Sequence, residues 1–208
     1  MTPIEFLAAF REARASAILR TDRQDLARLA MDAAVRGGFR VCEFTLTVPG
    51  AMELVREFSQ RPGLIVGAGT VLTREEARAA VQAGARFLVS PVVDEAVIQE
   101  AEKLGVASMP GCATPTEMLR AFRAGAQLQK LFPAPANGPV WVTQSLAPLP
   151  FLRIVPTAGV TIENAPGYLK AGAFAVGFVG SLFDPADITA GRFDAIEKRA
   201  RAMLAALA

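Results

Sequence analysis

The sequence predicts an α/β fold: a single (β/α)8 TIM barrel over residues 1–208, with an extra helix at its N-terminus. Short apolar or β-prone runs recur eight times along the chain, separated by alanine-rich segments whose apolar residues have helical spacing. Alternating strands and helices indicate a parallel sheet, and eight such units in ~200 residues fit a small barrel. No linker or low-complexity segment divides the chain. A doubly wound open sheet is the alternative that this pattern leaves open.

The expected elements follow in a regular order. Residues 1–16 carry charges at the spacing of an amphipathic helix, which argues against a signal peptide. Capping boxes at TREE (73–76) and TPTE (114–117) mark the start of two later helices, and glycines follow the helices. The eight expected strands are SAILR (16–20), RVCEFTL (40–46), LIVGAG (64–69), RFLVS (86–90), VASMP (106–110), QLQKLF (127–132), RIVPTAG (153–159) and FAVGFVG (174–180).

Composition excludes several classes of function. The net charge is +2 with no basic block, so neither nucleic acid nor an anionic membrane is indicated as a partner, and no apolar run reaches transmembrane length. Cys42 and Cys112 are too few for a disulfide framework or a zinc cluster, which predicts a reducing cytoplasm. The chain has no histidine. Acid–base chemistry must therefore use carboxylate, lysine, tyrosine, cysteine or water.

Lys130 is unusual because it interrupts an apolar strand. The chain has 22 basic residues, of which only four are lysine, and the other three lie on helices or near loops. Burial lowers the pKa of a lysine below its ordinary ~10.4 because it disfavours the charged form. A neutral amine can attack a carbonyl and form a Schiff base. Arginine would serve a static ion pair as well, so the choice of lysine favours an amine that loses its proton.

Glu43 is the expected partner of Lys130. Strand side chains alternate between faces, so Glu43 and Thr47 share the face that points into the barrel, whereas Cys42 and Phe44 face the helices. A buried glutamate needs a partner or a function. A general acid or base beside a cation is one interpretation. A structural ion pair between Glu43 and Lys130 is the other.

Further candidates lie at the ends of other strands, where the active sites of such barrels are built. Arg20 ends the first strand and could hold a carboxylate, and Thr70 in GAGT (67–70) could donate a hydrogen bond. A surface arginine and a capping turn are the alternatives. The glycine turns PTAGV (156–160) and GFVGS (177–181) close the last two strands, where phosphate often binds in barrels.

The motifs EFTLTVP, GAGTVLT, FLVSP, MPGCATPTE, QKLFPA, PTAGV and GFVGSLF, in this order, resemble the 2-keto-3-deoxy-6-phosphogluconate (KDPG) aldolase family, which includes 4-hydroxy-2-oxoglutarate (KHG) aldolases. The resemblance implies a cytoplasmic, metal-independent class I aldolase of carbohydrate metabolism (the Entner–Doudoroff pathway). Such an enzyme needs no cofactor, acts on a phosphorylated 2-keto acid and is usually a homotrimer. By the same resemblance Lys130 is the Schiff-base lysine and Glu43 the general acid/base. The implied substrate-binding residues are Arg20, Thr47, Gly69, Thr70, Pro91, Phe132 and Thr157, and the implied phosphate-binding residues are Ala158, Gly159, Gly180 and Ser181.

The chain departs from the family pattern at two positions. Many members have arginine where this chain has Thr47, so Arg20 would have to supply the cation for the substrate carboxylate. The usual PTGG is PTAG here, which adds the Ala158 methyl beside the phosphate. Related galactonate-series (KDPGal) aldolases tend to carry valine at Thr157, so threonine favours the gluconate series. KDPGal and KHG remain alternative substrates, and a phosphosugar isomerase or epimerase and a non-catalytic phospho-metabolite binder remain alternative classes.

Overall fold

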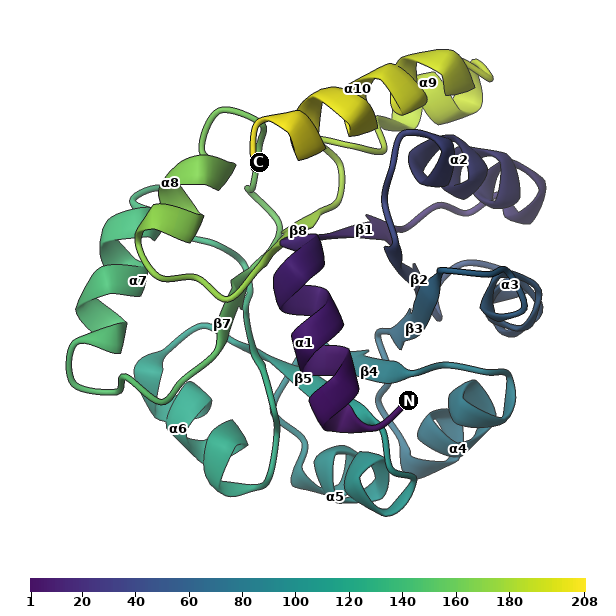
Figure 1. The fold of residues 1–208 in the computed structure, drawn as a ribbon. Coiled ribbons are helices and arrows are strands. Elements are labelled where there is room, and N and C mark those ends of the chain that lie inside the picture. Colours follow the sequence, from purple (N-terminus) through teal and green to yellow (C-terminus); the bar gives the residue numbers. More distant parts are fainter.

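The protein is a closed barrel of eight parallel strands surrounded by helices (Figure 1). A computed structural model describes residues 1–208. The strands are β1 (Ala15–Leu19), β2 (Val41–Thr45), β3 (Ile65–Gly69), β4 (Phe87–Ser90), β5 (Ala107–Cys112), β6 (Gln129–Leu131), β7 (Ile154–Pro156) and β8 (Val176–Phe178). The helices are α1 (Pro3–Ala13), α2 (Gln24–Arg36), α3 (Ala51–Ser59), α4 (Arg74–Gln82), α5 (Glu95–Lys103), α6 (Pro115–Arg123), α7 (Gly138–Leu146), α8 (Ala165–Lys170), α9 (Pro185–Thr189) and α10 (Phe193–Ala205).

Strand pairing confirms the barrel and shows that the open-sheet alternative is wrong. The order is β7-β6-β5-β4-β3-β2-β1-β8, with β1 paired to β8. A single parallel bridge between Thr157 and Gly177 then joins β7 to β8. An open sheet would leave both of these strands as edges. The seam between β7 and β8 is therefore the place where the barrel closes.

The predicted N-terminal helix is confirmed as α1, and it covers one end of the barrel (Figure 1). Phe6 and Phe10 on its inner face are fully buried, and the Phe6 ring stacks on Phe87 of β4 with 4.7 Å between centroids. These rings join an inner apolar cluster with inward-facing strand residues such as Val41 and Leu128. Because α1 fills this end, the site must open at the other end of the barrel, where the strands terminate.

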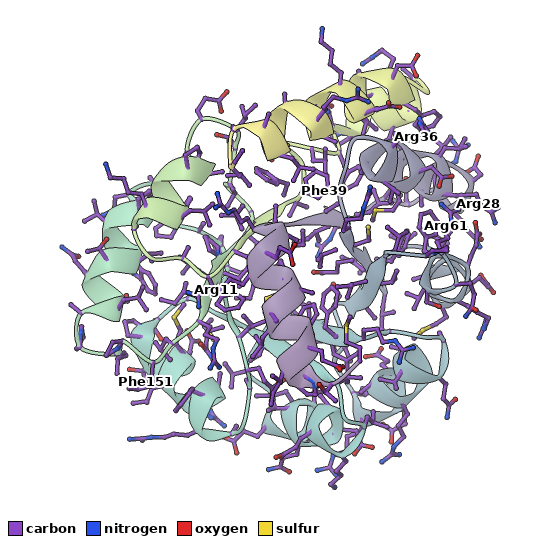
Figure 2. All side chains as sticks on the ribbon, in the orientation of Figure 1. Arg11, Arg28, Arg36, Phe39, Arg61 and Phe151 are labelled. Atoms are coloured by element: carbon purple, nitrogen blue, oxygen red, sulfur yellow. The ribbon has the colours of Figure 1, made fainter.

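An outer apolar cluster lies between the strands and the surrounding helices. It contains the strand residues whose side chains point away from the barrel interior, among them Cys42, Phe44 and Leu131. Ion pairs reinforce this layer around α2 (Figure 2). Arg28 contacts Glu57 of α3 at 2.6 Å, and Arg36 contacts Glu197 of α10 at 2.7 Å. Pairs this exposed contribute little singly, so burial of the apolar layer remains the main stabilising term.

The helix ends carry a regular pattern of charge. The predicted capping boxes at Thr73 and Thr114 are confirmed. Acidic residues lie in the first turn of eight helices, but α7 and α8 have none. Acidic side chains offset the positive end of a helix dipole. The N-terminus of α7 therefore keeps a positive potential, whereas Glu163 lies directly before the short helix α8.

Most of the expected strands differ from the observed ones by a few residues at their ends, and two of these differences affect residues discussed above. The second strand ends at Thr45, because the chain turns there and the Val48 N–H donates to the Thr45 carbonyl. Thr47 therefore does not belong to the inward-facing row. Cys112 belongs to β5, which extends beyond the expected end at residue 110, because Cys112 pairs with Leu131 of β6. No helix combines the length and the hydrophobicity needed to cross a bilayer.

Candidate active site

Glu43 and Lys130 both point into the barrel, as the alternation of their strands predicts. Glu43 is completely buried, and Lys130 is 8% exposed. Barrel interiors are filled in layers of four residues from alternate strands. Neighbouring strands of a barrel are staggered relative to one another. When this stagger is applied to the observed pairs of residues on neighbouring strands, one layer contains Glu43, Val89, Lys130 and Gly177. In this layer β2 and β6 lie opposite each other, so the carboxylate and the amine face each other across the interior.

The electrostatics of the two groups differ from those of a static ion pair. Neither oxygen of Glu43 has a hydrogen-bond partner, so the ion pair that the sequence left open is not formed. Burial raises the pKa of Glu43, although the charges of Lys130 and Arg20 oppose this rise. Burial likewise lowers the pKa of Lys130, against the opposing effect of Glu43. The arrangement favours a neutral amine beside a carboxyl group that can take up or release a proton.

Gly69 is required by the close approach of Glu43 to β3. A Cβ atom on Gly69 would lie only 2.0 Å from Oε1 of Glu43. The next residue, Thr70, has a φ of 61°, and its hydroxyl accepts a hydrogen bond of 3.5 Å from Nη2 of Arg20. The structure thus brings Arg20, Gly69 and Thr70 together beside Glu43. Arg20 lies just beyond β1 and is exposed, so its guanidinium is free to meet a carboxylate at the mouth.

Thr47 lies apart from this group. The prediction that it shares the inward face of the strand is wrong, because the strand ends two residues earlier. Its side chain is exposed at the rim, and its hydroxyl is 2.8 Å from that of Thr45. Thr45 in turn donates to the Leu19 carbonyl at 3.2 Å. These contacts fix the rim of β2 against β1, and a substrate role for Thr47 stays a prediction.

Phe132 and Pro91 lie near Lys130 at the ends of their strands. The Nζ atom of Lys130 is 5.1 Å from the centroid of the Phe132 ring. Gly111 of β5 pairs with Lys130, and a Cβ atom there would lie 2.2 Å from the Pro91 carbonyl oxygen. Gly111 therefore allows the chain after β4 to approach the lysine. Sequence reasoning missed this glycine, although a glycine inside a strand is a signal of close backbone approach.

The two glycine turns meet at the ends of β7 and β8. Ser181 donates to the Val160 carbonyl at 2.7 Å and so links them. The backbone N–H groups of Ala158, Gly159, Gly180 and Ser181 donate to no group of the chain. Both Ala158 and Gly159 have positive φ, of 53° and 113°. Successive N–H groups in such a conformation form a concave anion site.

Thr157 is fully buried, directly before the first of these turns, and its hydroxyl has no hydrogen-bond partner. It follows β7 on the same face as Val155, which belongs to the inner cluster. The predicted residues therefore all lie inside the barrel or around its mouth, and Thr47 lies at the exposed rim. The structure contains no group of three or more potential His, Cys, Asp or Glu metal ligands, and the expected independence of metal stays a prediction.

Known proteins share this arrangement. A model of the family described as KDPG and KHG aldolase matches residues 7–199. The KHG/KDPG aldolase of Escherichia coli K12 is 37% identical over 173 residues, or 81% of this chain and 80% of that protein. The probable 2-dehydro-3-deoxy-6-phosphogalactonate aldolase of Rhizobium meliloti is 37% identical over 193 residues, or 91% of this chain and 89% of that protein.

A solved structure adds chemical information. The KDPG aldolase of Legionella pneumophila, with pyruvate captured at low pH as a covalent carbinolamine intermediate, superposes with a TM-score of 0.84. It is 26% identical and covers 95% of this chain and 97% of its own. The fold and these similarities place the protein among the aldolases that are built on a parallel barrel. Within that class, the chain belongs to the KDPG and KHG aldolase family.

Proposed function

We propose that the protein cleaves KDPG to pyruvate and glyceraldehyde 3-phosphate through a Schiff base on Lys130. The observation that carries the proposal is the pairing of a buried amine of lowered pKa with a buried carboxyl group that has no hydrogen-bond partner, both in one layer of the barrel. No histidine is available for this chemistry. A buried lysine and a buried carboxylate are the groups that a metal-free aldol cleavage uses.

The reaction follows from these two groups. The neutral amine of Lys130 attacks the C2 ketone, and loss of water gives a cationic imine. Glu43, directly or through a water molecule, removes the C4 hydroxyl proton as the C3–C4 bond breaks, and the electron pair moves into the imine to form an enamine. Glyceraldehyde 3-phosphate leaves. Protonation at C3 and hydrolysis of the imine release pyruvate and regenerate the amine.

Two features support binding of the ends of the substrate. Arg20 and Thr70 can hold the carboxylate beside the reacting C2, which leaves Thr47 at the rim without a necessary role. The free N–H groups of the two glycine turns can hold the phosphate. The threonine hydroxyl of Thr157 supports the gluconate series, whereas valine is usual for galactonate-specific relatives. The homotrimeric state and the cytoplasmic location stay predictions from the resemblance.

A coupled assay tests the proposal. Lactate dehydrogenase and NADH report pyruvate release from KDPG, its galactonate epimer and 4-hydroxy-2-oxoglutarate. We expect turnover of KDPG and of its galactonate epimer, which are both phosphorylated, to exceed that of 4-hydroxy-2-oxoglutarate, which is not. KDPG should give the highest kcat/KM. If none of the three substrates released pyruvate, the proposal would be wrong. Ligand stabilisation in a melt without pyruvate release would instead indicate a binder, and EDTA-sensitive epimer exchange would indicate an epimerase.

Replacing Ala158 by glycine is expected to improve both stability and phosphate affinity. Alanine at a φ of 53° is strained relative to glycine, so Ala158→Gly should raise the free energy of unfolding by up to ~1 kcal/mol. Removal of the methyl should also lower KM for phosphorylated substrates. Denaturant unfolding and the coupled assay measure the two effects. The control is Ala147→Gly after α7, where φ is −55° and glycine should destabilise.

A further inference from the structure

The turn that follows β8 is held from outside the barrel by a side chain of α10. Arg199 donates a hydrogen bond of 2.6 Å from Nη1 to the carbonyl of Leu182. Leu182 comes directly after Ser181 and is fully buried. No backbone N–H donates to the Leu182 carbonyl, so the arginine is its only donor. A buried carbonyl without a donor is costly, so this bond restricts the conformation of the turn.

The guanidinium of Arg199 is itself fixed at its other nitrogen. Nη2 donates to Oδ2 of Asp187, and Oδ1 of Asp187 accepts a hydrogen bond of 2.7 Å from Nε of Arg192. Asp187 is 6% exposed and belongs to α9, which packs against α10 (Figure 1). The donors of arginine form a rigid planar fork. This fork therefore ties two acceptors to α10, one in the turn and one in α9.

The other contacts of the turn leave one side of it open. The Val179 carbonyl at the end of β8 accepts hydrogen bonds from the N–H groups of Leu182, at 3.1 Å, and Phe183, at 2.8 Å. The hydroxyl of Ser181 bonds to the neighbouring turn. A Cβ atom on Gly180 would have no atom within 4 Å beyond those of its two chain neighbours. The turn is thus fixed on the side of α10 and open beside Gly180.

We propose that Arg199 is a positioning residue for the substrate phosphate. Its bond to the Leu182 carbonyl holds the turn in the shape in which the free N–H groups of Gly180 and Ser181 converge on a phosphate. The inference rests on the proposed function, in which this turn binds the phosphate. Without the bond, the turn would have to be ordered when the substrate binds, and that ordering costs affinity. Arg199 thus acts through the turn, without contact with the substrate.

The variant Arg199→Met removes both bonds but keeps an unbranched side chain that can cover the same apolar surface. We expect KM for KDPG and Ki for inorganic phosphate to rise by ~10-fold or more, since a misplacement of ~1 Å can cost up to ~100-fold. The kcat for KDPG should stay close to that of the parent protein, as expected when only binding is lost. The kcat/KM for 4-hydroxy-2-oxoglutarate, which has no phosphate, should also stay close. Parent values of KM and Ki, or an equal loss on both substrates, would overturn the inference.

Two further variants separate positioning from charge and from general loosening of α10. Arg199→Lys keeps the charge but lacks the fork, so its affinity for phosphate should lie below that of the parent protein. Parent affinity in this variant would assign the effect to charge and overturn the inference. Arg36→Met is the matched control, because it removes another ion pair of α10, with Glu197 at 2.7 Å, and makes no bond to the turn. Its KM and Ki should equal the parent values, and a rise as large as that of Arg199→Met would contradict the inference.

A binding measurement does not depend on activity. In 15N-labelled protein, inorganic phosphate should shift the amide signals of Gly180 and Ser181, and the Kd from the titration should be ~10-fold higher in Arg199→Met. Without phosphate, 15N relaxation should show more ps–ns motion of these two amides in the variant than in the parent protein. Equal affinity in the two proteins would overturn the inference. A parent protein that cleaves no substrate would count against the proposed function, whereas the titration would still decide the role of Arg199.

Discussion

Incubation with pyruvate and borohydride is expected to add a pyruvate-derived mass to Lys130 and to no other lysine. The amine is buried in the barrel with a pKa lowered by burial, so a larger fraction is neutral near pH 7 than for a solvated lysine. Intact-mass and peptide mass spectrometry locate the adduct. Lys130→Met should abolish trapping and lower kcat/KM in the coupled assay by on the order of 10⁴-fold or more, the kind of loss that removal of a nucleophile gives.

The pH dependence of trapping gives a sharper test. Only the neutral amine attacks, so the rate should rise with pH, with a midpoint below the ordinary lysine pKa of ~10.4. A midpoint at the ordinary value would contradict the lowered pKa. Lys103→Met is the matched control, because Lys103 is exposed at the end of α5 and its loss should change neither trapping nor turnover. Full activity in Lys130→Met would end the Schiff-base proposal.

Glu43→Gln is expected to reduce turnover by ~10²–10⁴-fold while leaving pyruvate trapping on Lys130 intact. The amide keeps the shape of the side chain against Gly69 but cannot accept the C4 proton. The decrease in turnover of the parent protein at acidic pH provides a second measurement. Glu43 must be ionised to act as a base, and burial raises its pKa, so activity should fall as pH drops through a value above the ordinary ~4.3.

Glu100→Gln provides a control for loss of a buried carboxylate. Glu100 is 4% exposed and contacts Arg78 at 2.7 Å in the outer layer, and this bond lowers its pKa. The variant should lose some stability but keep its turnover and its pH profile. Unchanged turnover in Glu43→Gln would remove Glu43 from the acid–base role and leave only a structural function for it.

Much of the site could be predicted because a few local rules determine it. The period of two in strands is enough to turn Glu43 and Lys130 inward, and the glycines at 159 and 180 indicate turns with free N–H groups. Prediction failed at Thr47, where a hydrogen bond at the turn, rather than the β-prone sequence, ends the strand. The roles of Gly69, Gly111 and Gly177 depend on atoms of other strands, and the register that brings these together is set by the closed barrel.

The uneven distribution of acidic residues at the helix N-termini gives the barrel mouth a directional field. Carboxylates offset the dipoles of the helices that follow β1 to β5 and β8, and Glu163 lies directly before α8, but α7 keeps its dipole, directly after the strand that carries Lys130. An approaching anion would therefore be drawn towards the β6 side of the mouth before contact. Part of the orientation of the substrate is then determined in solution, by long-range electrostatic steering that salt would weaken.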